Sequence, residues 1–238
     1  MEQFKNRRYF LHKAIAVPVG VLVPTLIWSG PGPAATSAKE KADEEISPAE
    51  DLMREHGVLN RILLIYDEHL RRLTEKQDFD ATILAEAASI IRHFVEEYHE
   101  KLEEDFLFPR FKKAGKLVDL VDTLLQQHQA GRRLTAKIQD LAVTATVKNE
   151  TQRSRLKEAL QAFNRMYRPH EAREDTMLFP AFRGLVSKHE YGALGEEFEK
   201  KEDELFGEEG FFKVVHRVAA LEKELGTYDL AQFTPQAG

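Results

Sequence analysis

The chain has 238 residues, with 34 basic and 40 acidic side chains, nine histidines and no cysteine. This length suits one large domain with an appendage, and 42% hydrophobic with 31% charged residues describes a soluble globular protein. The lack of cysteine excludes disulfides, zinc ribbons and thiolate nucleophiles, and a net charge of −6 without a long basic run argues against nucleic acid. Metal or acid–base chemistry must therefore depend on histidine and carboxylate.

The first 38 residues differ from the rest. Lys5, Arg7, Arg8 and Lys13 precede an uncharged, mostly apolar stretch over residues 14–28, and Gly, Pro and small residues follow. This order predicts an export signal over residues 1–38, followed by a linker over 39–46. The stretch is short for a membrane-spanning helix, so we expect no stable membrane span after removal of the signal, with an uncleaved anchor as the alternative. Without these residues, which carry four basic and one acidic side chain, the net charge becomes −9.

The export route can be specified further. Residues 6–13 resemble the twin-arginine signal, with Asn6 in the place of the usual Ser or Thr. The resemblance implies a periplasmic protein.

Apolar residues three and four apart predict four long helices, over residues 48–76, 81–111, 117–141 and 150–187. Ser47, Pro48 and Glu50 form a helix-start signal, and Gly115 ends the second helix. The apolar pattern of the fourth helix includes both Met177 and Leu178. Short connections predict an all-α, up-down-up-down four-helix bundle over residues 47–188, with an extra C-terminal helix or helices and a tail in 189–238.

The second and fourth helices contain a repeat. His99 is followed by Glu at +1 and +4 and by Leu, Phe, Pro and Phe at +8, +9, +10 and +12, and His170 has the same pattern 71 residues later. The first and third helices hold His56 and His128, 72 residues apart, each four residues after a leucine. These offsets predict a duplicated helical hairpin with two equivalent half-sites.

The histidines of this repeat predict a metal site. Residues four apart share a helix face, so His99 with Glu103 and His170 with Glu174 each present an imidazole and a carboxylate to one point. A buried carboxylate without a partner is costly, which favours a metal. Imidazole and carboxylate without thiolate favour iron or manganese, with zinc possible. The predicted metal ligands are His56, His99, Glu103, His128, His170 and Glu174, whereas His69, His93, His189 and His216 are expected to be structural.

These residues resemble the haemerythrin family, particularly its His-His-Glu cation-binding branch, over about residues 47–186. The resemblance implies a non-haem di-iron centre. His56 and His99 would bind one iron and His128 and His170 the other, and Glu103 and Glu174 would correspond to the bridging carboxylates.

The sequence departs from the oxygen-carrying haemerythrins at two positions. Arg132 stands where these proteins place a second histidine on the third helix, and Asp175 stands at the position of their aspartate although the repeat favours Glu174. The missing histidine leaves one metal a ligand short. Glu100 and Glu171 are lower-ranked candidates to complete it.

The departures weaken the interpretation as a reversible oxygen carrier. The favoured hypothesis is a di-iron protein that binds or senses O₂, NO or a related small oxidant, with a diatomic or peroxide ligand as partner. A di-iron oxidase or peroxidase, and passive metal binding or storage, are the alternatives. The sequence alone does not decide whether the protein is an enzyme and identifies no redox partner.

Overall fold

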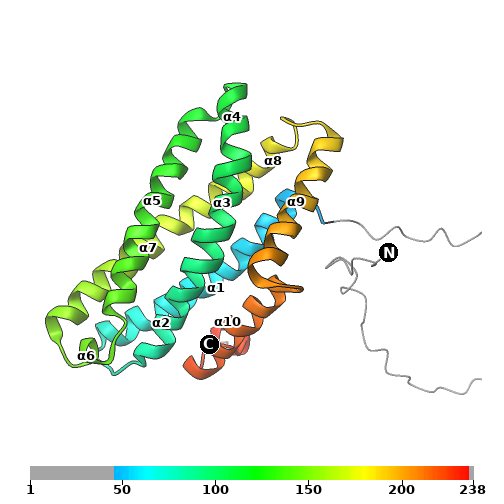
Figure 1. Cartoon of the computed structure of the whole chain (residues 1–238). Helices are drawn as coiled ribbons and strands as arrows, with labels where there is room; N and C mark the ends of the chain where they lie inside the picture. Colours follow the sequence, from blue (N-terminus) through cyan, green and yellow to red (C-terminus); the bar gives the residue numbers. More distant parts are fainter. Residues whose placement is uncertain (1–45, 236–238) are drawn as a thin grey trace, which may run out of the picture. The chain divides into compact units, whose positions relative to one another are not determined.

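The computed structural model of the protein describes residues 46–235, and the predicted export signal lies outside this range. Every regular element in the described range is helical, which confirms the all-α prediction. Three long α-helices form most of the bundle (Figure 1): α1 (Pro48–Thr74), α5 (Val118–Leu141) and α7 (Glu150–Arg173). In this part of the chain, no helix combines the length and apolar character needed to cross a membrane.

The second bundle helix is a continuous run of α-helical and π-helical turns. It consists of α2 (Ala81–Ile90), η2 (Ile91–His99), α3 (Glu100–Leu102), η3 (Glu103–Leu107) and α4 (Phe108–Ala114). The fourth bundle helix similarly continues from α7 through η4 (Glu174–Leu178) to α8 (Phe179–Phe182). A short helix, α6 (Thr144–Val147), lies in the connection between α5 and α7.

The four bundle helices form a closed ring of neighbours. Helix α7 packs against both α1 and α5, and α2 with η2 packs against α1 and α5 on the other side. Helices that follow one another in the chain are therefore neighbours, as the up-down-up-down prediction requires (Figure 1). The duplicated hairpins correspond to residues 48–114 and 118–182.

Side-chain caps fix where the helices begin. The Ser47 side chain accepts a hydrogen bond from the backbone N–H of Glu50, and Asp80 and Asn149 cap α2 and α7 in the same way. Such a cap satisfies a backbone donor that has no partner within the helix. Ser187 does not end the fourth helix as predicted, because this helix ends at Phe182 and Ser187 caps the next one.

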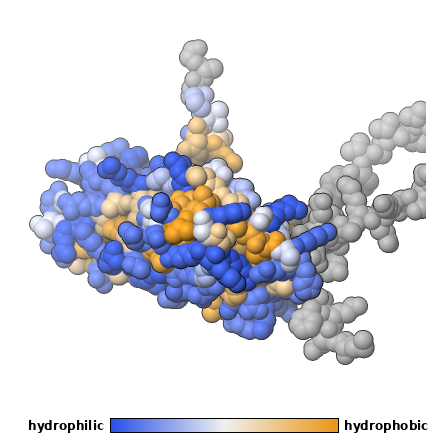
Figure 2. Space-filling view, turned by 90° about the horizontal axis from the view of Figure 1, so that it is seen from above, coloured by the Kyte–Doolittle hydropathy of each residue, from blue (hydrophilic) through white to orange (hydrophobic). Residues whose placement is uncertain are grey.

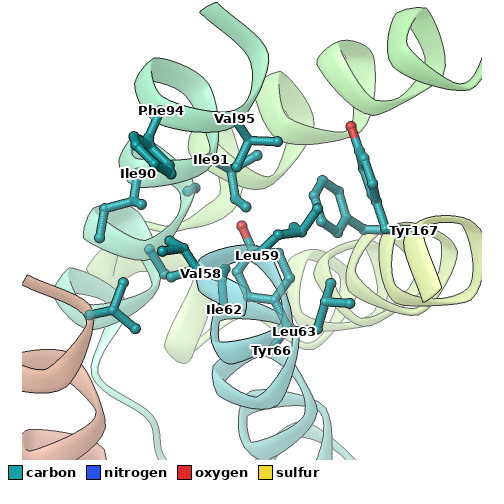
Figure 3. Close-up of a cluster of buried hydrophobic side chains, with 14 of the residues drawn as sticks. Val58, Leu59, Ile62, Leu63, Tyr66, Ile90, Ile91, Phe94, Val95 and Tyr167 are labelled. Carbon is teal, nitrogen blue, oxygen red and sulfur yellow. The ribbon is translucent and has the colours of Figure 1, made fainter. Parts of the chain in front are cut away.

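A large apolar cluster runs through the bundle interior. Val58, Leu59 and Ile62 of α1 lie against Ile91 and other residues of the second bundle helix, with Tyr167 of α7 beside them (Figure 3). Each of the α1 residues named is at most 2% exposed. Full burial of such a side chain contributes roughly 1.5–3 kcal/mol, so this cluster stabilises the packing of the bundle helices.

The C-terminal region forms two further helices, as predicted. Helix α9 (Lys188–Phe206) and helix α10 (Gly210–Leu225) pack on the outside of α1, and α10 also contacts α2. Their buried residues include Phe198, Val214 and Val218. The face shown in Figure 2 is mainly hydrophilic, with an apolar strip across it.

Candidate metal centre

All six predicted ligands come together inside the bundle. Each long helix contributes one histidine, and the second and fourth bundle helices add one glutamate each. None of the six is more than 4% exposed. The group consists of His56 on α1, His99 and Glu103 on the second bundle helix, His128 on α5, and His170 and Glu174 on the fourth bundle helix.

The six side chains form two adjoining half-sites. In the first half-site, the Nε2 atoms of His56 and His99 lie 3.1 Å apart, and Glu174 Oε2 lies 3.3 Å from His56 Nε2. In the same half-site, Glu103 Oε2 lies 3.9 Å from His99 Nε2.

The second half-site has the same composition. His128 Nε2 lies 3.4 Å from Glu103 Oε2, and His170 Nε2 lies 3.1 Å from Glu174 Oε2. Both carboxylates therefore lie between the two half-sites. Donor atoms of Glu103, His128, His170 and Glu174 all lie within 4.8 Å of one another, and the same holds for His56, His99 and Glu103.

The nitrogen and oxygen atoms of this centre are arranged for metal coordination and do not all satisfy one another by hydrogen bonds. Both oxygens of Glu103, both oxygens of Glu174 and Nε2 of His128 are buried and have no hydrogen-bond partner among the described residues. Leaving buried polar groups without a partner costs about 1–3 kcal/mol each, and more for charged groups. Cations placed between these atoms would compensate them.

A second layer of polar side chains orients the four imidazoles. Each histidine donates its Nδ1–H to an oxygen on another helix, which directs Nε2 towards the centre. The distances are 2.7 Å from His56 to Asp175, 2.8 Å from His99 to Glu55, 3.1 Å from His128 to Glu104, and 2.9 Å from His170 to Gln127.

The repeated phenylalanines cover the centre. The ring of Phe179 stacks on His56, and the ring of Phe108 stacks on His128, each with ring centroids 5.4 Å apart and an interplanar angle of 26°. These two contacts are equivalent in the two hairpins. The Phe-Pro motif therefore packs directly against the histidines.

The prolines of the same motif change the helix without ending it. A proline lacks the N–H that would bond the carbonyl four residues earlier, and its ring crowds that carbonyl. Just before Pro109 and Pro180, the chain widens: Phe108 N–H bonds the carbonyl of Glu103, and Phe179 N–H bonds that of Glu174, each five residues back. Both π-helical turns begin at a predicted carboxylate ligand, in keeping with the association of π-turns with functional sites.

The π-turn in the fourth bundle helix also corrects one prediction. Leu178 is fully buried, but Met177 is 43% exposed. Of the two residues, only Leu178 therefore belongs to the buried face of this helix.

Glu100 and Glu171 are buried and contact protein partners, and a donor atom of Glu100 also lies within 4.8 Å of donor atoms of Glu104 and His128. Glu100 accepts a hydrogen bond from the Tyr167 hydroxyl at 2.7 Å and contacts Arg132 at 2.8 Å. Glu171 accepts a hydrogen bond from Asn60. Burial raises the pKa of both carboxyl groups to about 8.

The protonation of the metal-free centre is uneven. Burial lowers the pKa of His56, but its contacts with Asp175 and Glu174 outweigh burial and raise the pKa to about 10. Burial lowers the pKa of His128 to about 4. Burial and the neighbouring charge of Glu174 raise the pKa of Glu103 well above its ordinary value. A cation entering the centre would displace protons, as metal binding generally does.

The residues that orient the imidazoles do not follow from the helix periodicity of the sequence. Glu55 and Gln127 directly precede His56 and His128, and Glu104 directly follows Glu103. The signal was present in the repeat, because an acidic residue stands five positions after both His99 and His170. The sequence presents Asp175 as a rival ligand to Glu174, whereas in the structure its carboxylate contacts His56 Nδ1.

The remaining described histidines lie outside the centre, as predicted. His69 is fully buried, and its Nδ1–H donates to the Ile65 carbonyl at 2.8 Å. His93 contacts the Ser89 carbonyl at 2.9 Å, and His189 and His216 are exposed.

The fold and the centre define a class: a helical bundle that carries a buried histidine–carboxylate metal site. Comparison with known families identifies it further. The haemerythrin HHE cation-binding domain matches residues 47–150 and again residues 119–236, and the chain belongs to this family. The two matches begin 72 residues apart, the same separation as His56 and His128, which supports the duplication. Family membership and the clustered ligands together support metal binding.

Relatives with high similarity occur in mycobacteria. Uncharacterised proteins of Mycobacterium tuberculosis and Mycobacterium bovis are 46% identical over 205 residues, covering 86% of this chain and 80% of each relative. No solved structure matches the chain.

Proposed function

We propose that the protein is a non-haem di-iron protein that binds or senses O₂, NO or a related small oxidant. The pair of buried half-sites, with four imidazoles and two carboxylates between them, carries this proposal. This donor set suits iron, and manganese or zinc are alternatives. Bound iron would supply redox chemistry and coordination positions for a small ligand.

The residues around the centre favour binding or sensing of a small oxidant over reversible transport of O₂. Arg132 stands where oxygen carriers place an additional histidine, and it contacts Glu100 and Glu104 at 2.8 Å instead. Each half-site therefore offers two imidazoles and the two shared carboxylates. A six-coordinate ion would keep positions open.

Iron loading tests the proposal directly. Protein loaded with Fe²⁺ without oxygen should contain two irons per chain and change its visible absorption on exposure to O₂ or NO. His99→Ala should lose metal, whereas His93→Ala, which alters an exposed histidine outside the centre, should behave like the parent. Two bound irons with no spectral response to O₂, NO or peroxide would contradict the proposal.

An oxidase or peroxidase is the second candidate. The observation that favours it is the buried set of Tyr167, Glu100 and Glu171 beside the ligands, which adds groups able to hold protons. Steady consumption of peroxide with a reductant, lost in His99→Ala, would select this function. Zinc or a single iron in protein purified without added metal would instead indicate passive binding or storage.

We also propose export to the periplasm by the twin-arginine route. The basis is the sequence of residues 1–38, which lie outside the described structure. This route moves folded proteins, so the metals could be loaded before export. A reporter fused to these residues should fail to be exported after Arg7→Lys with Arg8→Lys, and unchanged export would point to the general secretory route.

A further inference from the structure

The two half-sites have matching ligands but different neighbours. The duplication pairs Glu55 with Gln127, because each directly precedes the histidine of its hairpin. It also pairs Asn60 with Arg132, each four residues after that histidine. At the first pair of positions, the first hairpin has a carboxylate (Glu55) and the second has an amide (Gln127). At the second pair, the first hairpin has an amide (Asn60) and the second has a cation (Arg132).

The first half-site has a carboxylate on each imidazole. Glu55 accepts from His99 and Asp175 accepts from His56. Within the described chain, no lysine or arginine forms an ion pair with either carboxylate. The other oxygen of Glu55 is buried without a hydrogen-bond partner. Both imidazoles of the first half-site therefore have a carboxylate acceptor that no cationic side chain of the described residues shares.

The second half-site has weaker acceptors. His170 donates to the neutral amide oxygen of Gln127. His128 donates to Glu104, but this carboxylate also contacts Arg132 at 2.8 Å and Lys101 at 2.5 Å. Two cations therefore share its charge.

When a carboxylate accepts the Nδ1–H of an imidazole, the imidazole becomes a stronger donor to a metal at Nε2. The effect is smaller when the acceptor is a neutral amide or a carboxylate paired with cations. We propose that the two half-sites are unequal: the first (His56 and His99) binds its metal more tightly and favours the ferric ion, and the second (His128 and His170) binds more weakly and retains a divalent ion. This inference rests on the proposed two-metal centre and adds an order of occupancy and oxidation to it.

Anaerobic titration of the metal-free full-length protein with Fe²⁺ tests the order of occupancy. We expect two steps whose dissociation constants differ by about 10–100-fold, the usual size of such outer-partner effects. Glu55→Gln should weaken the tighter step. Gln127→Glu combined with Arg132→Asn gives the second half-site the groups of the first and should tighten the weaker step. Gln127→Glu alone provides the same test if the double variant does not fold, as judged by circular dichroism.

A Mössbauer spectrum after addition of one oxidising equivalent of ferricyanide gives a second readout. Wild-type protein should show a single ferric and a single ferrous signal, because each ion keeps to one half-site, whereas the Gln127→Glu, Arg132→Asn variant should show two ferric and two ferrous signals. Two equal, independent sites in the wild type, or a Glu55→Gln effect confined to the weaker step, would overturn the inference. Fewer than two irons per chain would instead overturn the di-iron proposal.

Discussion

Gly131 allows α5 to approach α7 more closely than any larger residue would. A Cβ at this position would lie 2.0 Å from Tyr167 Oη and 2.8 Å from its Cζ. Gly131→Ala should therefore push the tyrosine away from Glu100. We expect a loss of about 1–3 kcal/mol in the free energy of unfolding, as for other overpacked cores, measured by urea denaturation.

Gly57 provides the matched control. It lies inside α1, and a Cβ there would meet no atom within 4 Å. Gly57→Ala should leave stability unchanged or raise it by up to about 1 kcal/mol, because alanine favours the helix more than glycine does. Equal stability of the two variants would show that the contact with Tyr167 does not constrain position 131.

His56 makes the stability of the metal-free protein depend on pH. Its pKa of about 10 in the folded state lies above the ordinary value of 6.5. Its contribution to stability is therefore complete below pH 6.5 and is lost as the pH rises towards 10. Asp175→Asn removes a partner of the protonated form and should flatten this decline, measured by urea denaturation across that range.

Asp140, an exposed residue on α5, provides the control for this experiment. Asp140→Asn should keep the pH dependence of the parent protein. If Asp175→Asn kept it too, His56 would not be the group responsible.

Among the helical elements, α2 depends on a single cap. Asp80 accepts hydrogen bonds from the backbone N–H of Thr82 at 2.8 Å and from its hydroxyl at 2.7 Å. Asp80→Ala should reduce the free energy of unfolding by about 0.5–2 kcal/mol. Asp78→Ala, at an exposed neighbouring position outside the helix, should have little effect, and thermal denaturation of both variants would measure the difference.

The helices could be predicted because their signals are local. Ser47 and Gly115 mark helix ends through contacts within a few residues, and apolar spacing identifies the buried faces. The π-turns could not be predicted in this way. Pro109 indicates a disturbed helix, but its local sequence does not distinguish an end, a kink or a widened turn, and the neighbouring Phe108 packs on His128 from another helix.

The same distinction applies to the metal centre. A histidine and a glutamate four apart on one helix need no tertiary information, which located four candidate ligands, and the matching offset between His56 and His128 located the other two. The partners of the imidazoles require knowledge of how the hairpins face each other. Asp175 and Glu104 each reach a histidine of the opposite hairpin.

For the whole molecule, α9 and α10 should add stability without contributing ligands. Phe198 of α9 is fully buried, and Phe198→Ala should cost about 3–5 kcal/mol. Leu205 on the same helix is 58% exposed, so Leu205→Ala should stay within about 0.5 kcal/mol of the parent. Denaturation and metal content should be measured together, and loss of metal in folded Phe198→Ala protein would contradict this division of roles.

Side chains of each hairpin reach the half-site of the other hairpin, and this affects how the two hairpins are held together. Each hairpin supplies both imidazoles of one half-site, but Glu103 and Glu174 lie between the two half-sites, and Phe108 and Phe179 each cover a histidine of the other hairpin. Metal ions held by both carboxylates would cross-link the two halves of the chain at the middle of the bundle. Loss of metal would therefore weaken the contacts between the two hairpins before it unfolded any single helix.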